Sequence, residues 1–453
     1  MRLMHYIFGM PPLRGGGTIK YAMDLAAGQI ELGYDVAIIY PGEIRKNHTK
    51  VKIIVNKDIG KIKVYEIINP LPVPLVTGIK EPSRFMEGTD KEVYREFLEK
   101  AEIDILHIHS LMGLHKEFLE VAREKGIKLI FTTHDYFGIC PKTNLLYNGK
   151  ICNDCDWMNC RICCANAEDV SILMRRQSHW FQYLIKYKQL VKVKHMLCKD
   201  AVHSQDEGRR IVNDTDNNIV ETHTDSYEKL RNYYLEELNM IDVMHYNSTV
   251  AKEQYEKRIT PRKAVLLRGM HREIYDERKI RSCKRKIRFS YLGYAVDYKG
   301  YDLLLDVLDE LEKSYASRFV LNTYIGDSVK KRQYIRQHEP YAYDELGRVF
   351  DDMDVLIVPS LWAETYGLVV LEAFSFGIPV IVTNNVGASD LVRQYEGTGI
   401  IVEPTYESLK MALEDVLVKK ERINQMNRAI CEAKIDFGYE KYIKTIISEV
   451  YLG

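Results

Sequence analysis

The segment 354–383 constrains the fold of this chain more than any other stretch. Its first part, Val355–Val358, is a short β-branched apolar run, which is typical of a buried parallel strand. A helix is expected from about Tyr366 to Gly377, and a second apolar run follows it. A strand, a helix and a strand in this order predict a Rossmann-like βαβ unit of a parallel α/β sheet.

Two glutamates, Glu364 and Glu372, flank the start of this helix. The first-turn amides of a helix have no partner within it, so they can bind a diphosphate without a metal ion. Glu372 would lie on the order of 9 Å from the start of the helix, measured along the helix axis, and could accept hydrogen bonds from both ribose hydroxyls. Glu364 could hold hydroxyls of a transferred sugar. The amides concerned are those of Tyr366, Gly367, Leu368 and Val369. This geometry suits a nucleotide-sugar; the alternative is a βαβ unit with two solvated glutamates.

The same stretch resembles the E-x7-E segment of retaining glycosyltransferases of family 4, which have the GT-B fold. The turn 384–390 falls where that family has a Gly-rich turn and an acidic residue. The resemblance is strong over 287–404 and moderate at 1–40 and 100–140. It implies two Rossmann-like domains facing a cleft and a front-face substitution that keeps the anomeric configuration. In such a reaction the departing phosphate helps to take the acceptor proton.

Length and charge agree with an enzyme of this kind. A chain of 453 residues is expected to form two or three domains. Lys+Arg and Asp+Glu are equal at 64 each, so no global field favours nucleic acid. The amino terminus lacks a signal-peptide core, and no run approaches the roughly 20 apolar residues of a membrane span. We therefore expect a cytoplasmic protein with reduced cysteines.

Three regions are expected along the chain. Residues 1–270 alternate strands and helices and predict an N-terminal, acceptor-side Rossmann-like domain with a cysteine-rich insertion at 140–164. Residues 271–435 predict a C-terminal Rossmann-like domain that binds the nucleotide-sugar. In a GT-B protein, residues 436–453 would form a helix that packs back on the first domain. The polar stretch 213–225 has the composition of an exposed insertion.

A run of three glycines, Gly15 to Gly17, follows the first expected strand and precedes a helix. Glycines there allow positive φ and close approach of a ligand to the backbone. The family has a similar loop over the donor phosphate and acceptor, and Gly17 matches its position nearest the helix. The alternative is a tight strand-to-helix turn, which needs about one glycine.

Three histidines stand at the ends of expected strands. His134, beside Asp135, resembles the family histidine next to the reacting sugar. There it would bond to the donor sugar or to the charge developing at the anomeric carbon. For His107 and His109 a structural role is favoured.

The loop after the first strand of the second domain usually provides an arginine and a lysine to the diphosphate in this family. Lys299 matches the lysine, but Tyr294 stands where the arginine is expected. Either one cation suffices or another arginine replaces the missing one. Arg268, at the expected domain hinge, is the candidate.

Six of the nine cysteines lie between positions 140 and 164. Two C-x2-C pairs a few residues apart are typical of a tetrahedral, structural zinc site that takes no part in catalysis. Spacing favours Cys152, Cys155, Cys160 and Cys163, whereas resemblance favours Cys140, Cys152, Cys160 and Cys163. Disulfides and an iron–sulfur cluster are the alternatives, and no cofactor is expected for catalysis.

The segment 172–195 contains arginines, lysines and interleaved aromatics but no acidic residue. A basic aromatic helix could rest on the inner face of an anionic membrane and bring a lipid-linked acceptor to the site. The alternative is a core-packing helix with a solvated basic face.

The sequence thus predicts a retaining hexosyltransferase-type glycosyltransferase (EC 2.4), which moves a sugar from a nucleoside-diphosphate-sugar to a hydroxyl of a carbohydrate or lipid-linked acceptor. The resemblance to the family implies bacterial surface-polysaccharide assembly as the setting. One rival is a GT-B nucleotide-sugar epimerase, which needs no second substrate. The other is a catalytically silent binding subunit, for which Tyr294 is the main support. Neutral net charge argues against a nucleic-acid reader.

Overall fold

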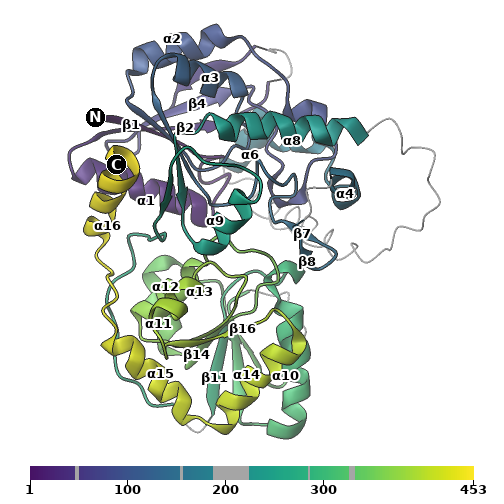
Figure 1. The fold of residues 1–453 in the computed structure, drawn as a ribbon, viewed down its shortest axis with the longest axis vertical. Helices are drawn as coiled ribbons and strands as arrows, with labels where there is room; N and C mark the ends of the chain where they lie inside the picture. Colours follow the sequence, from purple (N-terminus) through teal and green to yellow (C-terminus); the bar gives the residue numbers. More distant parts are fainter. Residues whose placement is uncertain (46–49, 154–156, 187–223, 284–285, 326–331) are drawn as a thin grey trace, which may run out of the picture.

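The computed structural model describes residues 1–453 apart from 46–49, 154–156, 187–223, 284–285 and 326–331. The chain forms two α/β domains, which lie one above the other in Figure 1. The first domain is built on an eight-stranded sheet of order β10-β9-β6-β5-β1-β2-β4-β3. Its strands are β1 (Arg2–Tyr6), β2 (Asp35–Pro41), β3 (Lys52–Val55), β4 (Lys63–Ile68), β5 (Ile105–Ile108), β6 (Lys128–Thr132), β9 (Val243–Tyr246) and β10 (Ala264–Leu266).

The second domain has a six-stranded, fully parallel sheet of order β13-β12-β11-β14-β15-β16. The strands are β11 (Ile287–Tyr291), β12 (Phe319–Thr323), β13 (Ile335–Gln337), β14 (Val355–Val358), β15 (Val380–Thr383) and β16 (Gly399–Val402). Strands β12, β14 and β15 are buried along their whole length, as expected of apolar strands covered by helices on both faces.

Helices surround both sheets. In the first domain they are α1 (Gly17–Glu31), α2 (Lys91–Ala101), α3 (Lys116–Glu124), α4 (Trp157–Cys163), α5 (Val170–Arg176), α6 (His179–Lys186), α8 (Thr224–Asn239) and α9 (Thr249–Glu256). In the second they are α10 (Tyr301–Tyr315), α11 (Leu346–Asp351), α12 (Leu368–Ser375), α13 (Ser389–Gln394), α14 (Tyr406–Val418) and α15 (Glu421–Glu432). Short 3₁₀ turns cover Leu75–Thr77, Pro82–Phe85, Asp297–Lys299 and Tyr343–Glu345.

One strand departs from the expected parallel arrangement. β3 runs antiparallel to β4 at the edge of the first sheet. A parallel pair needs a crossover of about a dozen residues or more, and only 56–62 separate these two strands. The chain can therefore only turn back on itself here.

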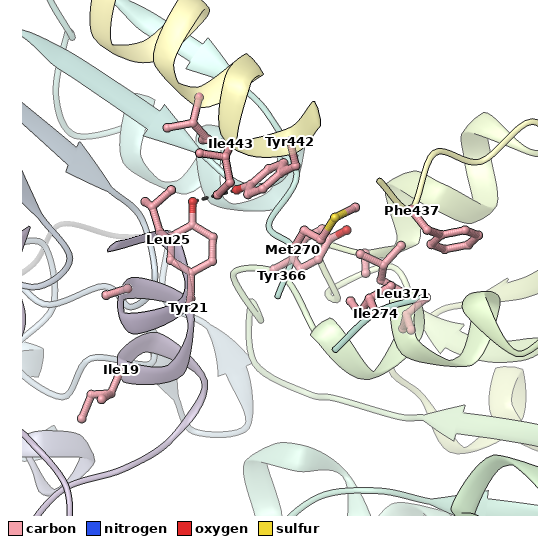
Figure 2. Close-up of a cluster of buried hydrophobic side chains, with 14 of the residues drawn as sticks. Ile19, Tyr21, Leu25, Met270, Ile274, Tyr366, Leu371, Phe437, Tyr442 and Ile443 are labelled. Carbon is pink, nitrogen blue, oxygen red and sulfur yellow. Dashed lines mark hydrogen bonds between the residues drawn. The ribbon is translucent and has the colours of Figure 1, made fainter. Parts of the chain in front are cut away.

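The C-terminal segment returns to the first domain. Helix α16 (Tyr439–Thr445) continues as a π-helix over Ile446–Leu452, and in Figure 1 it lies beside α1, far from α15. Tyr442 and Tyr21 share a hydrogen bond of 2.7 Å between their hydroxyls, drawn as a dashed line in Figure 2. A Cβ on Gly28 would lie 2.9 Å from Ile443, so the helices touch closely. This segment packs into one buried cluster with residues of both domains.

No helix in the described part of the chain is long and apolar enough to cross a membrane. The expected basic aromatic helix at 172–195 is divided between α5 and α6, and its residues beyond 186 lie outside the described ranges, as does nearly all of the polar stretch 213–225. Trp180 and Tyr183 on α6 are exposed.

Candidate active site

Helix α12 begins at Leu368, two residues later than expected, so Tyr366 lies outside it. Gly367 is the N-cap and adopts a left-handed conformation with φ 91°, which separates the preceding loop from the helix. A Cβ at this position would lie 2.8 Å from Val386 Cγ1, so a side chain is excluded for steric reasons too. The amides of Gly367, Leu368 and Val369 donate to none of the described residues. They remain available to a ligand.

Glu364 is fixed in the loop ahead of α12. Its main chain pairs with the turn after β15, since its amide donates to Asn385 O at 2.9 Å. Its side chain accepts from Lys299 Nζ at 2.6 Å through Oε1 and from Ser360 Oγ at 2.5 Å through Oε2. The carboxylate is therefore held in one orientation and carries a compensating positive charge beside it.

Lys299 ends the short 3₁₀ turn before α10. The next residue, Gly300, has φ 73°, and a Cβ there would lie 1.9 Å from the carbonyl oxygen of Pro359. Only glycine lets this turn lie directly against the end of β14. The Lys299 ammonium lies 5.1 Å from the centre of the Trp362 ring, as well as against Glu364. One cation thus stands at the carboxyl end of β14.

Glu372 lies inside α12 and is almost fully buried. Its Oε1 accepts a hydrogen bond from Nε2 of His271, a fully buried residue, at 2.8 Å. His271 Nδ1 faces Glu273 at 3.3 Å, and Glu273 pairs with Lys20 on α1. Glu372 is therefore oriented by a chain of polar contacts that reaches the first domain.

The glycine loop of the first domain faces this helix. Gly17 is the first residue of α1, and Gly16 is its N-cap with φ 113°. A Cβ on Gly17 would lie 3.9 Å from Leu368 Cδ1, so the N-termini of α1 and α12 meet. Neither first turn contains an acidic residue, and the amides of Gly15, Gly16 and Gly17 donate to none of the described residues. Two positive helix ends therefore point to one place.

His134 follows β6 and lies beside the same loop. Its carbonyl oxygen accepts from Thr365 Oγ1 at 3.0 Å, next in sequence to Glu364. Its ring packs against that of Tyr21, with centres 4.7 Å apart. Burial, with a contribution from nearby His245, lowers the pKa of His134 to about 3. The imidazole is therefore neutral at physiological pH and can act as a hydrogen-bond partner without carrying charge.

Two residues, Tyr294 and Arg268, bear on the missing arginine, and in the described part of the chain neither forms a hydrogen bond or ion pair with Glu364 or Glu372. The Tyr294 side chain is exposed, and Arg268 donates to the main-chain carbonyl of Asp436. Arg268 would have to leave that carbonyl in order to reach a diphosphate.

The cysteine-rich insertion forms the hairpin of β7 (Leu146–Tyr147) and β8 (Lys150–Ile151), followed by α4. Burial and the nearby thiols of Cys140, Cys163 and Cys152 raise the pKa of Cys160 to about 12. These four thiols are thus neighbours. In the described part of the chain, however, no three of them come within 4.8 Å of one another, and Cys155 lies outside it.

Sequence reasoning missed several residues around the site. Among them are His271, Ser360, and Thr249, whose amide and hydroxyl donate to Asp390 at 2.8 and 2.5 Å across the two domains. The residues around His271 do not indicate a role at the site, because its partner Glu372 is distant in sequence. The pairing of His5 with His107 on adjacent strands could have been found from the order of the parallel strands.

Two family models match the chain, one in each half. "Glycosyltransferase Family 4" matches residues 15–167, and "Glycosyl transferases group 1" matches residues 275–433. Both the fold and the matches confirm the expected architecture of two Rossmann-like domains. The chain therefore belongs to the family 4 glycosyltransferases of the GT-B fold.

Among curated relatives, an uncharacterized 41.2 kDa protein in the cps region of Klebsiella pneumoniae is 37% identical over 26% of this chain and 33% of its own length. A D-inositol 3-phosphate glycosyltransferase of Paenarthrobacter aurescens is 32% identical over 31% of this chain and 33% of its own length. The similarity thus spans about a third of each of these relatives.

Solved structures match over the whole chain. WaaG, a glycosyltransferase involved in lipopolysaccharide biosynthesis, aligns with a TM-score of 0.57 and 12% identity over 99% of this chain and 100% of WaaG. Anabaena HepE in complex with UDP-glucose aligns with a TM-score of 0.55 and 10% identity over 100% of both chains. At such identities the likeness establishes the fold.

Proposed function

We propose that this protein transfers a sugar from a nucleoside diphosphate to a hydroxyl acceptor and keeps the anomeric configuration, as a retaining hexosyltransferase does. The observation that carries this proposal is the meeting of the N-termini of α1 and α12 beside the Lys299–Glu364 pair. Unpaired amides at two positive helix ends are suited to a diphosphate. The UDP-glucose bound in HepE, which shares the fold, is consistent with a nucleotide-sugar donor.

Each residue then has a role in the transfer. The amides of Gly367, Leu368 and Val369 hold the diphosphate, and Lys299 offsets the charge that develops on it as the bond to the sugar breaks. Glu364 accepts hydrogen bonds from hydroxyls of the sugar, Glu372 holds the ribose, and Gly17 lies over the phosphates. Because Glu364 is already held by a hydroxyl and an ammonium, it positions the sugar and need not act as a nucleophile.

The proposed function is tested by melting the full chain with UDP- and GDP-sugars. A donor that binds the folded state at 100 times its Kd stabilises it by about 2.7 kcal/mol. We expect one donor to raise the Tm and to be hydrolysed slowly to sugar and nucleoside diphosphate in the presence of EDTA. Conversion of the donor into an epimer would instead identify an epimerase, and binding without turnover would identify a silent binding subunit.

We further propose that the acceptor belongs to surface polysaccharide assembly and is reached at the inner face of a membrane. The cps-region relative and the named role of WaaG support the setting, and exposed Trp180 and Tyr183 on α6 support the membrane contact. Flotation of the full chain with anionic vesicles, compared with Trp180→Ala and with Met411→Ala on the exposed face of α14, measures this contact. Equal flotation of all three proteins would refute it.

A structural zinc in the cysteine-rich insertion is proposed as well. The cluster supplies thiols of the kind that zinc prefers, and binding would favour thiolates that burial otherwise keeps protonated. We expect elemental analysis of the purified chain to find about one zinc per chain. Cys160→Ser should lower both the zinc content and the Tm, whereas Cys431→Ser on α15 should change neither. Purified protein without zinc would overturn the assignment.

A further inference from the structure

Five histidines of the first domain belong to one network of hydrogen bonds that ends at the proposed sugar site. They lie on, or directly after, adjacent strands of the sheet: His245 on β9, His134 after β6, His107 and His109 at β5, and His5 on β1. All of them except His134 are fully buried. Burial lowers the pKa of each, to about 4 for His5 and His245, so every ring in the network is neutral.

A neutral imidazole has one donor and one acceptor nitrogen, so a single fixed partner sets its tautomer. The fixed partner here is the carbonyl oxygen of Leu267, in the linker between the domains, which can only accept. His245 Nε2 donates to it at 2.8 Å, and His245 Nδ1 must therefore accept from the hydroxyl of Thr132 at 2.8 Å. The Thr132 oxygen in turn accepts from His107 Nε2 at 2.6 Å.

The same reasoning assigns donors and acceptors at the next contacts, which involve Tyr451 of the C-terminal segment. His107 Nδ1 must then be an acceptor, and it accepts a hydrogen bond from the Tyr451 hydroxyl at 2.7 Å. The Tyr451 oxygen accepts from Gln29 Nε2 at 2.8 Å, which turns Gln29 Oε1 toward His5. His5 Nε2 must then donate to that oxygen at 2.8 Å.

The last links reach the site. His5 Nδ1 accepts from His109 Nε2 at 3.0 Å, and His109 Nδ1 accepts from His134 Nε2 at 3.1 Å. The proton of His134 is therefore on Nε2. Its Nδ1 carries a lone pair and has no partner in the described part of the chain. Each contact in this arrangement pairs one donor with one acceptor, whereas reversing any single contact would set two donors or two acceptors against each other.

The network is not arranged as a metal site. The nitrogens of His5, His107 and His109 lie within 4.8 Å of one another. Each of their six ring nitrogens already has a hydrogen-bond partner, however, so no lone pair is left for an ion. A metal could bind only by breaking the chain of contacts.

We propose that this network fixes His134 as the Nε2–H tautomer and that its bare Nδ1 accepts a hydrogen bond from a hydroxyl of the transferred sugar. Tyr451 and Gln29 are then positioning residues, which act on the site through the histidines without touching the substrate. The assignment of the tautomer stands on the structure alone, and the contact with the sugar rests on the proposed function. An acceptor nitrogen suits a hydroxyl or developing positive charge at the sugar and is unsuited to a phosphate oxygen.

The tautomer is tested by ¹⁵N spectra of the histidine rings in the full chain without any donor, with His134→Gln used to assign the signal. In the wild type, Nδ1 of His134 is expected to give the signal of an unprotonated ring nitrogen and Nε2 that of a protonated one. Tyr451→Phe removes the hydroxyl that orients Gln29 and should yield a mixture of tautomers. Tyr442→Phe is the matched control, since it removes a buried hydroxyl of the same C-terminal segment outside the network. A protonated Nδ1 of His134 in the wild type would overturn the proposal, whatever Tyr451→Phe shows.

The contact with the sugar is tested by activity in the same variants. Tyr451→Phe should lower kcat about tenfold with little change in KM for the donor, and Tyr442→Phe should leave kcat near that of the wild type. Donors with single hydroxyls replaced by fluorine identify the contact, because fluorine cannot donate to Nδ1. If every such donor reacts equally in the wild type and in His134→Gln, the contact is refuted while the tautomer stands. If no donor reacts at all, the proposed function fails instead.

Discussion

Replacing Lys299 by methionine is expected to lower kcat/KM for the donor by roughly 100- to 1,000-fold, the usual cost of removing one group that stabilises developing charge. Tyr294 occupies the place of the second cation and is exposed, whereas the Lys299 ammonium contacts Glu364 of the E-x7-E segment directly. The loss should fall mainly on kcat, because the charge on the leaving diphosphate grows as the bond breaks.

Matched variants separate charge from packing in this prediction. Lys299→Arg keeps the positive charge and should retain a measurable part of kcat/KM, while Lys313→Met on the exposed face of α10 should retain all of it. A value of kcat/KM in Lys299→Met equal to that of the wild type would refute the role. Arg268→Ala completes the set: if its kcat/KM is unchanged, one cation is sufficient, and Arg268 only ties the linker to Asp436.

Much of the fold followed from the sequence because parallel strands and their helices carry strong local patterns. The apolar run at 355–358, the glycine before α1 and the strand–helix alternation were all sufficient to place the elements. The antiparallel β3 was missed because composition does not encode direction; the short connection to β4 does. The start of α12 was misplaced because the local sequence does not show that Gly367 takes a left-handed conformation, nor that its Cα lies so close to Val386 that no side chain fits.

The same distinction applies to the site. Glu364 and Gly17 could be chosen because each stands beside a strand end or a helix start, where parallel sheets bind ligands, and Lys299 because it matches the lysine of the family. Partners such as His271 come from elsewhere in the chain and depend on tertiary packing. The histidine network is the clearest case, because Gln29 and Tyr451 are joined through a contact across 422 positions. No pattern in either local sequence indicates that these two side chains act on His134.

Replacing Glu372 by glutamine is expected to abolish the preference of the protein for a ribonucleoside donor over its 2′-deoxy counterpart. A hydrogen bond to a charged group contributes about 1.5–3 kcal/mol, so the wild type should favour the ribose form by roughly 10- to 150-fold in kcat/KM. Glutamine retains an oxygen that can accept from His271, so the buried histidine keeps its partner and the helix should remain folded.

The comparison of two donors in two proteins isolates the contact from any general loss of activity. Lower activity of Glu372→Gln toward both donors in equal proportion would mean that the glutamate supports α12 without touching the ribose. A ratio that falls toward one in the variant, with the Tm unchanged, would place the ribose hydroxyls on this carboxylate. The orientation of Glu372 by His271, Glu273 and Lys20 then has a functional consequence: the first domain, through Lys20 on α1, helps to position the group that binds the nucleoside.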